Sequence, residues 1–415
     1  MICSFPITNH INNAFFMKKD IMEWFQLRGV IFDSMEVKEH IFLKVRCPRT
    51  WSMCPKCTRS TRKIHNRKVR YILHSASEGK RVYIACTVRR FFCTRCRKPF
   101  TETLPPWMNG RYRYTKIFEE SVTKELISES FSEVSKKFGV CGHTLLAILR
   151  RRAQSVEIPG GELILNVDEH SFSGRDLKIG IAEINNKKFL AILDDDNQMT
   201  LENYFNSWPE EAKSRVLEVC IDMKSSYLTV LKRIFPKAKI VVDHFHVVKE
   251  MCRQVDEMRK ILQPEGAKGT RRIHRFLLLK NRSNLSSRER QDLDLVFKAY
   301  ANHPALKGAY FVKEKVREMY ASPNRKEAER KLDMILSQLE HHEVGKLKEM
   351  RDTLIRWKPY ILNFFERRTT NAFIEGCHNK IKLIKRMSYG FRNFKNYVLK
   401  ITLAFLPFIF LNLPH

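Results

Sequence analysis

The chain has 415 residues, of which 43% are hydrophobic and 11% aromatic, as in folded proteins that bury large cores. Its 76 Lys and Arg residues outnumber its 45 Asp and Glu residues, and the resulting formal charge of +31 is spread along the whole chain. These features argue against a mostly disordered chain. They favour a polyanionic partner, nucleic acid above acidic lipid.

The first motif is a pair of C-x-x-C sequences, Cys54 with Cys57 and Cys93 with Cys96. Four thiolates complete a tetrahedral zinc site, and the strand-like alternation between the pairs predicts hairpins. We therefore expect a structural zinc ribbon that contacts DNA, in residues 40–108, after an N-terminal lead, residues 1–39. Other residues could substitute as ligands, although a buried or a surface role is the simpler interpretation of each: Cys47, Cys86 and His65. The eleven cysteines accompany no apparent signal peptide, which favours thiols or metal over disulfides.

Residues 109–158 lose the strand pattern and predict a helix-turn-helix. A serine followed by Glu133 is typical of a helix start, and Gly139-Val140 fits the tight turn. The second helix, from about His143, would be the recognition helix. The alternative is a helix pair without a role in DNA binding. The residues expected to contact DNA here are Lys136, Lys137, His143, Arg150, Arg151 and Arg152.

Residues 159–250 follow a Pro-Gly-Gly break and predict three strands in a meander, then strand, helix, strand and helix. This is the order of an RNase H-like sheet. Asp168, Asp222 and Asp243 each close an apolar run. Carboxylates held at strand ends suit Mg²⁺, and two such ions serve in-line phosphoryl displacement. Each aspartate taken alone also fits a turn or a helix cap.

Residues 251–366 predict an all-α insertion, with Trp357 in its core, and residues 367–415 return to the catalytic core. Glu375 is the one acidic residue between Arg367 and the C-terminus. Taken alone, it fits a surface salt-bridge partner. It lies beside an apolar stripe that would pack on the sheet: Ile374, Cys377, Ile381 and Ile384. The polar face that continues from it would face phosphates: His378, Lys382, Lys385 and Arg386.

The apolar C-terminal stretch "ITLAFLPFIFLNL" is too short to span a bilayer and contains a proline, so we expect a core helix or an interface and no membrane partner.

The stretches "NVDEHSFSGRD", "CIDMKSSYLTVLKRIFPKAKIVVDHFHVVK" and "TTNAFIEGCHNKIKLIKRMSYGFRNFKNY" resemble the ISL3 family of bacterial DDE transposases, from about residue 40 to residue 400. The resemblance implies an RNase H-like core whose catalytic triad is Asp168, Asp222 and Glu375. It implies two Mg²⁺ (or Mn²⁺) ions on this triad and an auxiliary role for Asp243 and His246. The sequence departs from the family at Lys224, where the family has an aromatic residue.

We therefore expect an α/β protein with an RNase H-like core interrupted by an all-α insertion, preceded by a zinc ribbon and a helix-turn-helix. The expected function is that of an insertion-sequence transposase in the bacterial cytoplasm. It would bind terminal inverted repeats and target DNA as a homodimer. The alternatives are a DNA-binding repressor or domesticated transposase without catalysis, and a structure-specific nuclease of the same fold.

Overall fold

The computed structural model describes residues 14–77, 79–108, 112–153, 157–263, 274–340 and 345–406. The chain divides into two compact units: unit 1 is Met1–Ser155 with Leu383–His415, and unit 2 is Val156–Lys382. Across the described ranges, no helix has the length and apolar character needed to span a bilayer. The last residues of the apolar C-terminal stretch, from Pro407 on, lie outside the described ranges.

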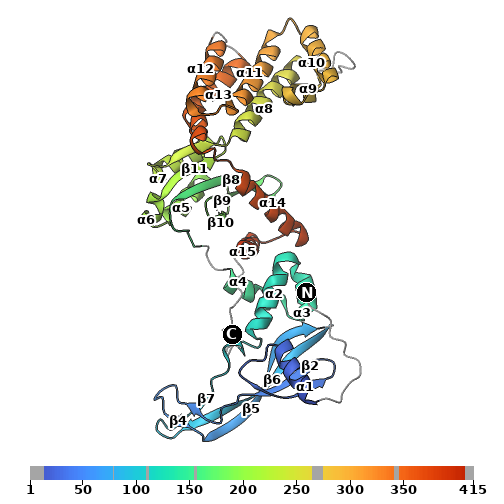
Figure 1. Ribbon diagram of the computed structural model, residues 1–415, viewed down its shortest axis with the longest axis vertical. Helices are drawn as coiled ribbons and strands as arrows, with labels where there is room; N and C mark the ends of the chain where they lie inside the picture. Colours follow the sequence, from blue (N-terminus) through green and yellow to red (C-terminus); the bar gives the residue numbers. More distant parts are fainter. Residues whose placement is uncertain are drawn as a thin grey trace. The chain divides into compact units, whose positions relative to one another are not determined.

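Unit 1 is built on a sheet with the strand order β1-β2-β6-β5, to which β7 adds by pairing with β6 (Figure 1). The predicted alternation is present as a long antiparallel hairpin of β5 and β6. The N-terminal lead is part of this sheet, because β1 pairs with β2. One face of the sheet is buried under α1 and η1 through Leu43, Ile84 and Trp107. The elements are α1 (Ala14–Trp24), β1 (Ile31–Val37), β2 (Ile41–Arg46), β3 (Ser52–Met53), β4 (Ser60–Thr61), β5 (Ile64–Ser77), β6 (Lys80–Cys93), β7 (Lys98–Thr101) and η1 (Pro106–Met108).

The predicted helix-turn-helix residues form two helices joined by a three-residue turn. Ser130 and Glu133 close a capping box at the first helix, and Gly139 ends it with a left-handed φ of 62°. These helices share a core with two others, through side chains such as Phe118 and Leu149. The four helices are α2 (Lys116–Ser128), α3 (Phe131–Phe138), α4 (Gly142–Arg152) and α15 (Phe394–Phe405).

The position of α15 differs from the predicted boundary, which assigned residues 367–415 to the catalytic core. From Leu383 onward the chain belongs to unit 1, and α15 packs against α2 and α4. Leu403 joins their core, and the buried ammonium of Lys400 donates to the backbone carbonyl of Glu129 at 2.7 Å. The sequence showed an apolar helix face but not the partner that covers it.

Unit 2 contains a sheet with the order β10-β9-β8-β11-β12. The first three strands are antiparallel, while β8, β11 and β12 run parallel. All five strands follow the predicted apolar runs. Two helices between β10 and β11 were not predicted, although Leu201 and Phe205 have helical spacing and join the core. The elements are β8 (Leu163–Ser173), β9 (Asp176–Glu183), β10 (Lys188–Ile192), α5 (Gln198–Asn206), α6 (Glu210–Ser214), β11 (Val216–Ile221), α7 (Ser225–Ile234) and β12 (Lys239–Val242).

The helices between residues 244 and 367 gather together beyond the sheet (Figure 1). They share one continuous hydrophobic core with it, in which Trp357 is 3% exposed, as predicted. The last long helix returns to the sheet, where the Asn363 amide donates to the carbonyl of Ile240 at 2.8 Å. These elements are α8 (His244–Leu262), α9 (Arg275–Leu279), η3 (Arg282–Asn284), α10 (Ser287–Ala299), α11 (Pro304–Tyr320), α12 (Arg325–Leu339) and α13 (Lys346–Arg367). The next helix, α14 (Ala372–Met387), begins in unit 2 and ends in unit 1.

Candidate active site and metal centres

Three aspartates lie side by side at one edge of the unit 2 sheet. Val167 in β8 pairs with Ile221 in β11, and Ile221 pairs with Val242 in β12. The residue after each is an aspartate: Asp168, Asp222 and Asp243. Because the three strands are parallel and in register, they deliver these carboxylates to the same edge.

Two helices add side chains that could bind a metal to this edge. His246, in the first turn of α8, places Nε2 3.1 Å from the Asp222 carboxylate. The ligand atoms of Asp168, Asp222 and His246 lie within 4.8 Å of one another, and so do those of Asp243, His246 and Glu375. His246 is therefore common to two groups that could each hold a metal ion. A pocket of about 440 Å³ is lined by Asp168, Asp222, His246 and Glu375, the last an exposed residue in the first turn of α14.

Asp168 is buried and Asp222 is half-buried, and their carboxylates would repel one another if both were ionised. Burial and the negative charge of Asp168 raise the pKa of Asp222 to about 9. Burial would also raise the pKa of Asp168, but contacts from His378 and from the backbone amide of Glu169 hold it below its ordinary value. A cation bound between the two carboxylates would favour the ionised form of both. Carboxylate oxygens are the donors that Mg²⁺ prefers, so these residues fit that ion.

His378 supports Asp168 from α14. Its Nδ1 lies 3.3 Å from the Asp168 carboxylate, and the side chain is 6% exposed. The ring packs over Gly180, which pairs with Asp168 across the β8–β9 ladder. A Cβ at Gly180 would lie 2.4 Å from Nε2 of His378, so the glycine leaves room for the ring. The prediction that His378 lies on the polar face of α14 was therefore wrong, because this glycine lets the helix approach the strand.

Two buried asparagines join the start of α14 to the sheet. Asn166 of β8 donates to the side-chain oxygen of Asn371, and Asn371 donates to Asp222, each at 3.0 Å. The backbone carbonyl of Asn371 also accepts from the amide of Glu375. One residue thus connects a central carboxylate to the helix turn that carries Glu375. Neither asparagine was among the site residues predicted from the sequence.

Lys224, which follows Asp222 by two residues, is held within unit 2. Its ammonium bonds to Glu169, to the Asp196 carboxylate at 3.0 Å and to the Tyr227 hydroxyl at 3.1 Å. These partners raise its pKa despite partial burial. Lys224 therefore ties the segment after β11 to the segment after Asp168.

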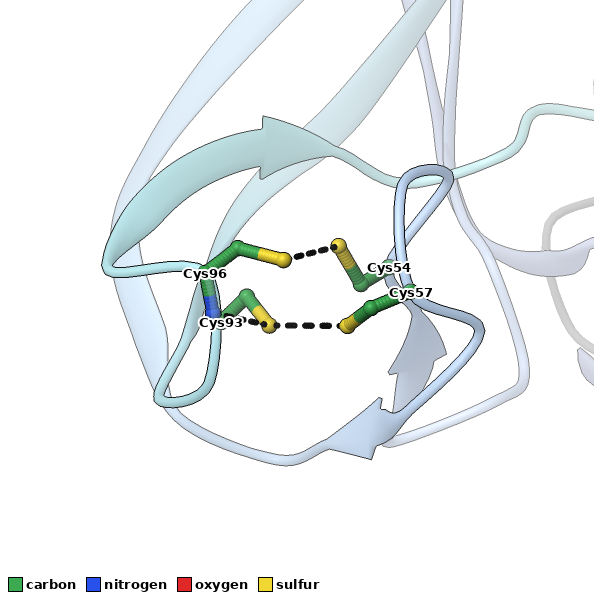
Figure 2. Close-up of side chains that lie close together, drawn as sticks. All are labelled: Cys54, Cys57, Cys93 and Cys96. Carbon is green, nitrogen blue, oxygen red and sulfur yellow. Dashed lines mark hydrogen bonds between the residues drawn. The ribbon is translucent and has the colours of Figure 1, made fainter.

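The predicted cysteine knuckles meet at one point of unit 1 (Figure 2). The Sγ atoms of Cys54 and Cys96 are 3.9 Å apart and those of Cys57 and Cys93 are 3.5 Å apart. All four lie within 4.8 Å of one another, as needed for one tetrahedral ion. The alternative ligands do not belong to this group: Cys47, Cys86 and His65.

The two knuckles have the same backbone turn. Thr58 and Arg97, each directly after the second cysteine of its pair, have left-handed φ angles of 57° and 51°. This turn carries the chain away from the ligands, so each pair of thiols can face the other. The repetition of an uncommon conformation indicates a built metal site.

The predicted DNA-binding cations of unit 1 fall into two sets. Arg151 and Arg152 both bond to Glu119, at 3.0 and 3.1 Å, so these guanidiniums brace α4 against α2. Lys137 pairs with Glu125. Lys136, Lys137, His143 and Arg150 are exposed, whereas Arg151 and Arg152 are half-buried. On α14, Lys382 lines the unit 2 pocket, Lys385 is half-buried and Arg386 is exposed.

The fold and the site together define a class of protein. It is a mixed α/β protein with a four-cysteine cluster and a carboxylate-lined pocket. A family model described as "Transposase", that of the ISL3-type DDE transposases, matches residues 165–401. The chain belongs to the ISL3 family of transposases.

Two relatives extend this similarity along the chain. The transposase for insertion sequence element IS1001 of Bordetella parapertussis is 27% identical over 363 residues, which cover 85% of this chain and 88% of that protein. The transposase for insertion sequence element IS1557 of Mycobacterium tuberculosis is 23% identical over 329 residues, covering 69% of this chain and 71% of the relative. Both matches span more of the chain than the family model does.

Proposed function

We propose that this protein is the transposase of an insertion sequence, which cleaves the ends of its element and joins them to target DNA. The catalytic residues would be Asp168, Asp222 and Glu375. The observation that carries the proposal is their presence on one pocket, supplied by β8, by the end of β11 and by the first turn of α14. The strand order supports an RNase H-like core, with α8–α13 as its helical insertion.

The carboxylates of this pocket would hold two Mg²⁺ or Mn²⁺ ions. Bound metal supplies activation of the attacking oxygen and stabilisation of the leaving oxygen. Asp168 and Asp222 offer rigid oxygens because they extend from paired strands, and Asn371 and His246 orient Asp222. Asp243, whose carboxylate lies within 4.8 Å of His246, would be an auxiliary acid. Lys382 would bind a DNA phosphate beside Glu375.

Unit 1 would bind DNA at the terminal repeats. The four cysteines would hold a structural Zn²⁺ ion, since tetrahedral thiolates suit zinc. On α4, His143, Ala147 and Arg150 are exposed and lie on one helix face, which could enter a major groove. A homodimer on DNA is part of the proposal, because joining both ends of an element requires a catalytic site at each. The protein would act in the cytoplasm, where bacterial DNA lies.

The proposal is tested by cleavage and strand transfer on DNA carrying the inverted repeats that flank the gene, with Mg²⁺. We expect Glu375→Gln to lose about 10²–10³-fold in cleavage, the scale for removing one group that stabilises transition-state charge. Glu318→Gln, at an exposed position of α11, is the matched control and should keep full activity.

Other outcomes would redirect the assignment. Undiminished activity in Glu375→Gln contradicts the role of Glu375. Tight DNA binding without any metal-dependent cleavage would favour a repressor. Cleavage of branched DNA, with no preference for repeats and no joining, would favour a nuclease.

A further inference from the structure

Phe245 is an exposed aromatic side chain among the charged residues of the unit 2 pocket. It is 54% exposed and lines the pocket together with Asp222 and Glu375. The residues on either side of it in the sequence make contacts elsewhere. His244 packs against the rings of Tyr320 and Phe364, and His246 contacts Asp222. Phe245 is not among the described hydrophobic residues that pack against the unit 2 core, so core packing does not account for it.

Cations and an amide surround this ring. Lys249 follows Phe245 by four residues on α8, which places it on the same helix face, and it lines the same pocket. Asn379 and Lys382 reach the pocket from α14. The His246 ring meets Phe245 nearly perpendicularly, with centroids 5.6 Å apart and planes at 78°, and so holds the ring beside the carboxylates.

An exposed aromatic ring beside lysines is better suited to binding a nucleotide than to binding a protein partner. A protein partner would cover an apolar patch, whereas here one ring stands among charged groups. Nucleobases offer a π-face to an aromatic side chain, and their phosphates pair with lysine. A pocket of about 440 Å³ is also within the usual size of small-ligand sites, roughly 300–1,000 Å³.

We propose that Phe245 stacks on an unpaired base of the nucleotide beside the phosphate that reaches Asp168 and Asp222, with Lys249 and Lys382 on the adjoining phosphates. The inference rests on the proposed function and adds to it a specific ligand, a base displaced from the duplex. A base that remains paired keeps both of its faces against its neighbours, so it cannot stack on the side chain.

The test measures binding in Ca²⁺, so that it does not depend on cleavage. The probe is a forked DNA that carries one inverted repeat, with unpaired nucleotides at the element boundary. In a second version, each unpaired nucleotide in turn is abasic. Stacking is worth about 1–3 kcal/mol per base, so Phe245→Ala should weaken binding of the intact fork by about 5- to 150-fold. Phe245→Trp should retain affinity. Phe276→Ala, which removes an 80% exposed phenylalanine from α9, is the control.

The abasic series identifies the partner of the ring. If Phe245 stacks on one base, removing that base weakens wild-type binding by the same factor and has no further effect on Phe245→Ala. Equal affinity of wild type and Phe245→Ala for the intact fork would overturn the inference. The inference would also fail if, at every position, removal of the base weakened the binding of Phe245→Ala as much as it weakened the binding of wild type. A protein that shows the stacking pattern but never cleaves DNA in Mg²⁺ would contradict the proposed function and leave the binding site in place.

Discussion

At the scale of single residues, the position of Asp168 depends on a histidine and a glycine that lie outside the proposed catalytic triad. Gly180→Ala would place a methyl group 2.4 Å from Nε2 of His378, so the ring must move away from Asp168. We expect Mn²⁺ affinity, measured by calorimetry, and Mg²⁺-dependent cleavage to fall by about 10- to 100-fold, as when a group that orients a metal ligand is lost.

A second substitution separates this positioning role from general damage to the strand. His378→Asn is smaller and keeps an amide that can donate to Asp168. In the Gly180→Ala background it should therefore restore part of the Mn²⁺ affinity, so that the two effects are not additive. Additive losses would show that Gly180→Ala acts through β9 alone, and the positioning role would be abandoned.

The residues around Asp168 show which parts of the site could be predicted from the sequence and which could not. Asp168 and Asp222 were predicted because apolar runs end at them, and the family resemblance supplied Glu375. Helical spacing gave the buried stripe of α14 but misplaced His378, since its burial depends on a missing side chain about 200 residues upstream. The Asn166–Asn371 contact could not be predicted from the sequence either, because no local pattern indicates that two asparagines far apart in the chain are paired.

At the scale of elements, hydrophobic runs predicted the strands of unit 2, whereas the assignment of α15 needed its partner. The ammonium of Lys400 is buried and donates to Glu129 and Ser388, which fastens α15 to the end of α2. Burial lowers the pKa of Lys400 to about 8. In an unfolded chain the pKa of a lysine is about 10.4. Between the folded and unfolded pKa values of Lys400, the unfolded state therefore binds more protons than the folded state.

The free energy of unfolding of unit 1 should therefore rise with pH from about 8 to 10, by at most about 3 kcal/mol. Denaturant unfolding, followed by hydrogen exchange in α2 and α15, would measure this rise. Lys400→Met should lack it, while Lys395→Met, at an exposed position of α15, should retain it. A rise of equal size in Lys400→Met would assign the pH dependence to other groups.

At the scale of the whole molecule, the two units have different sources of stability. Unit 2 has one core that runs from the sheet through the helices α8–α13, which explains why the predicted insertion does not form a core of its own. Unit 1 divides its apolar residues between two smaller cores and adds the four-cysteine group. A structural zinc ion contributes about 10–16 kcal/mol to the folding of small domains, so metal loss should affect the two units unequally.

We expect a strong chelator, or the substitution Cys57→Ser, to remove one zinc per chain and to abolish hydrogen-exchange protection in β3–β7. Protection in β8–β12 should persist, because their core contains no cysteine of this group. Metal analysis with exchange mass spectrometry measures both effects, and Cys141→Ser, which alters an exposed thiol outside the group, should keep zinc and protection. Loss of protection in both sheets together would mean that they unfold as one. Unchanged protection in β3–β7 after zinc removal would mean that the hairpins are held by their apolar contacts, and the cysteines would then need another role.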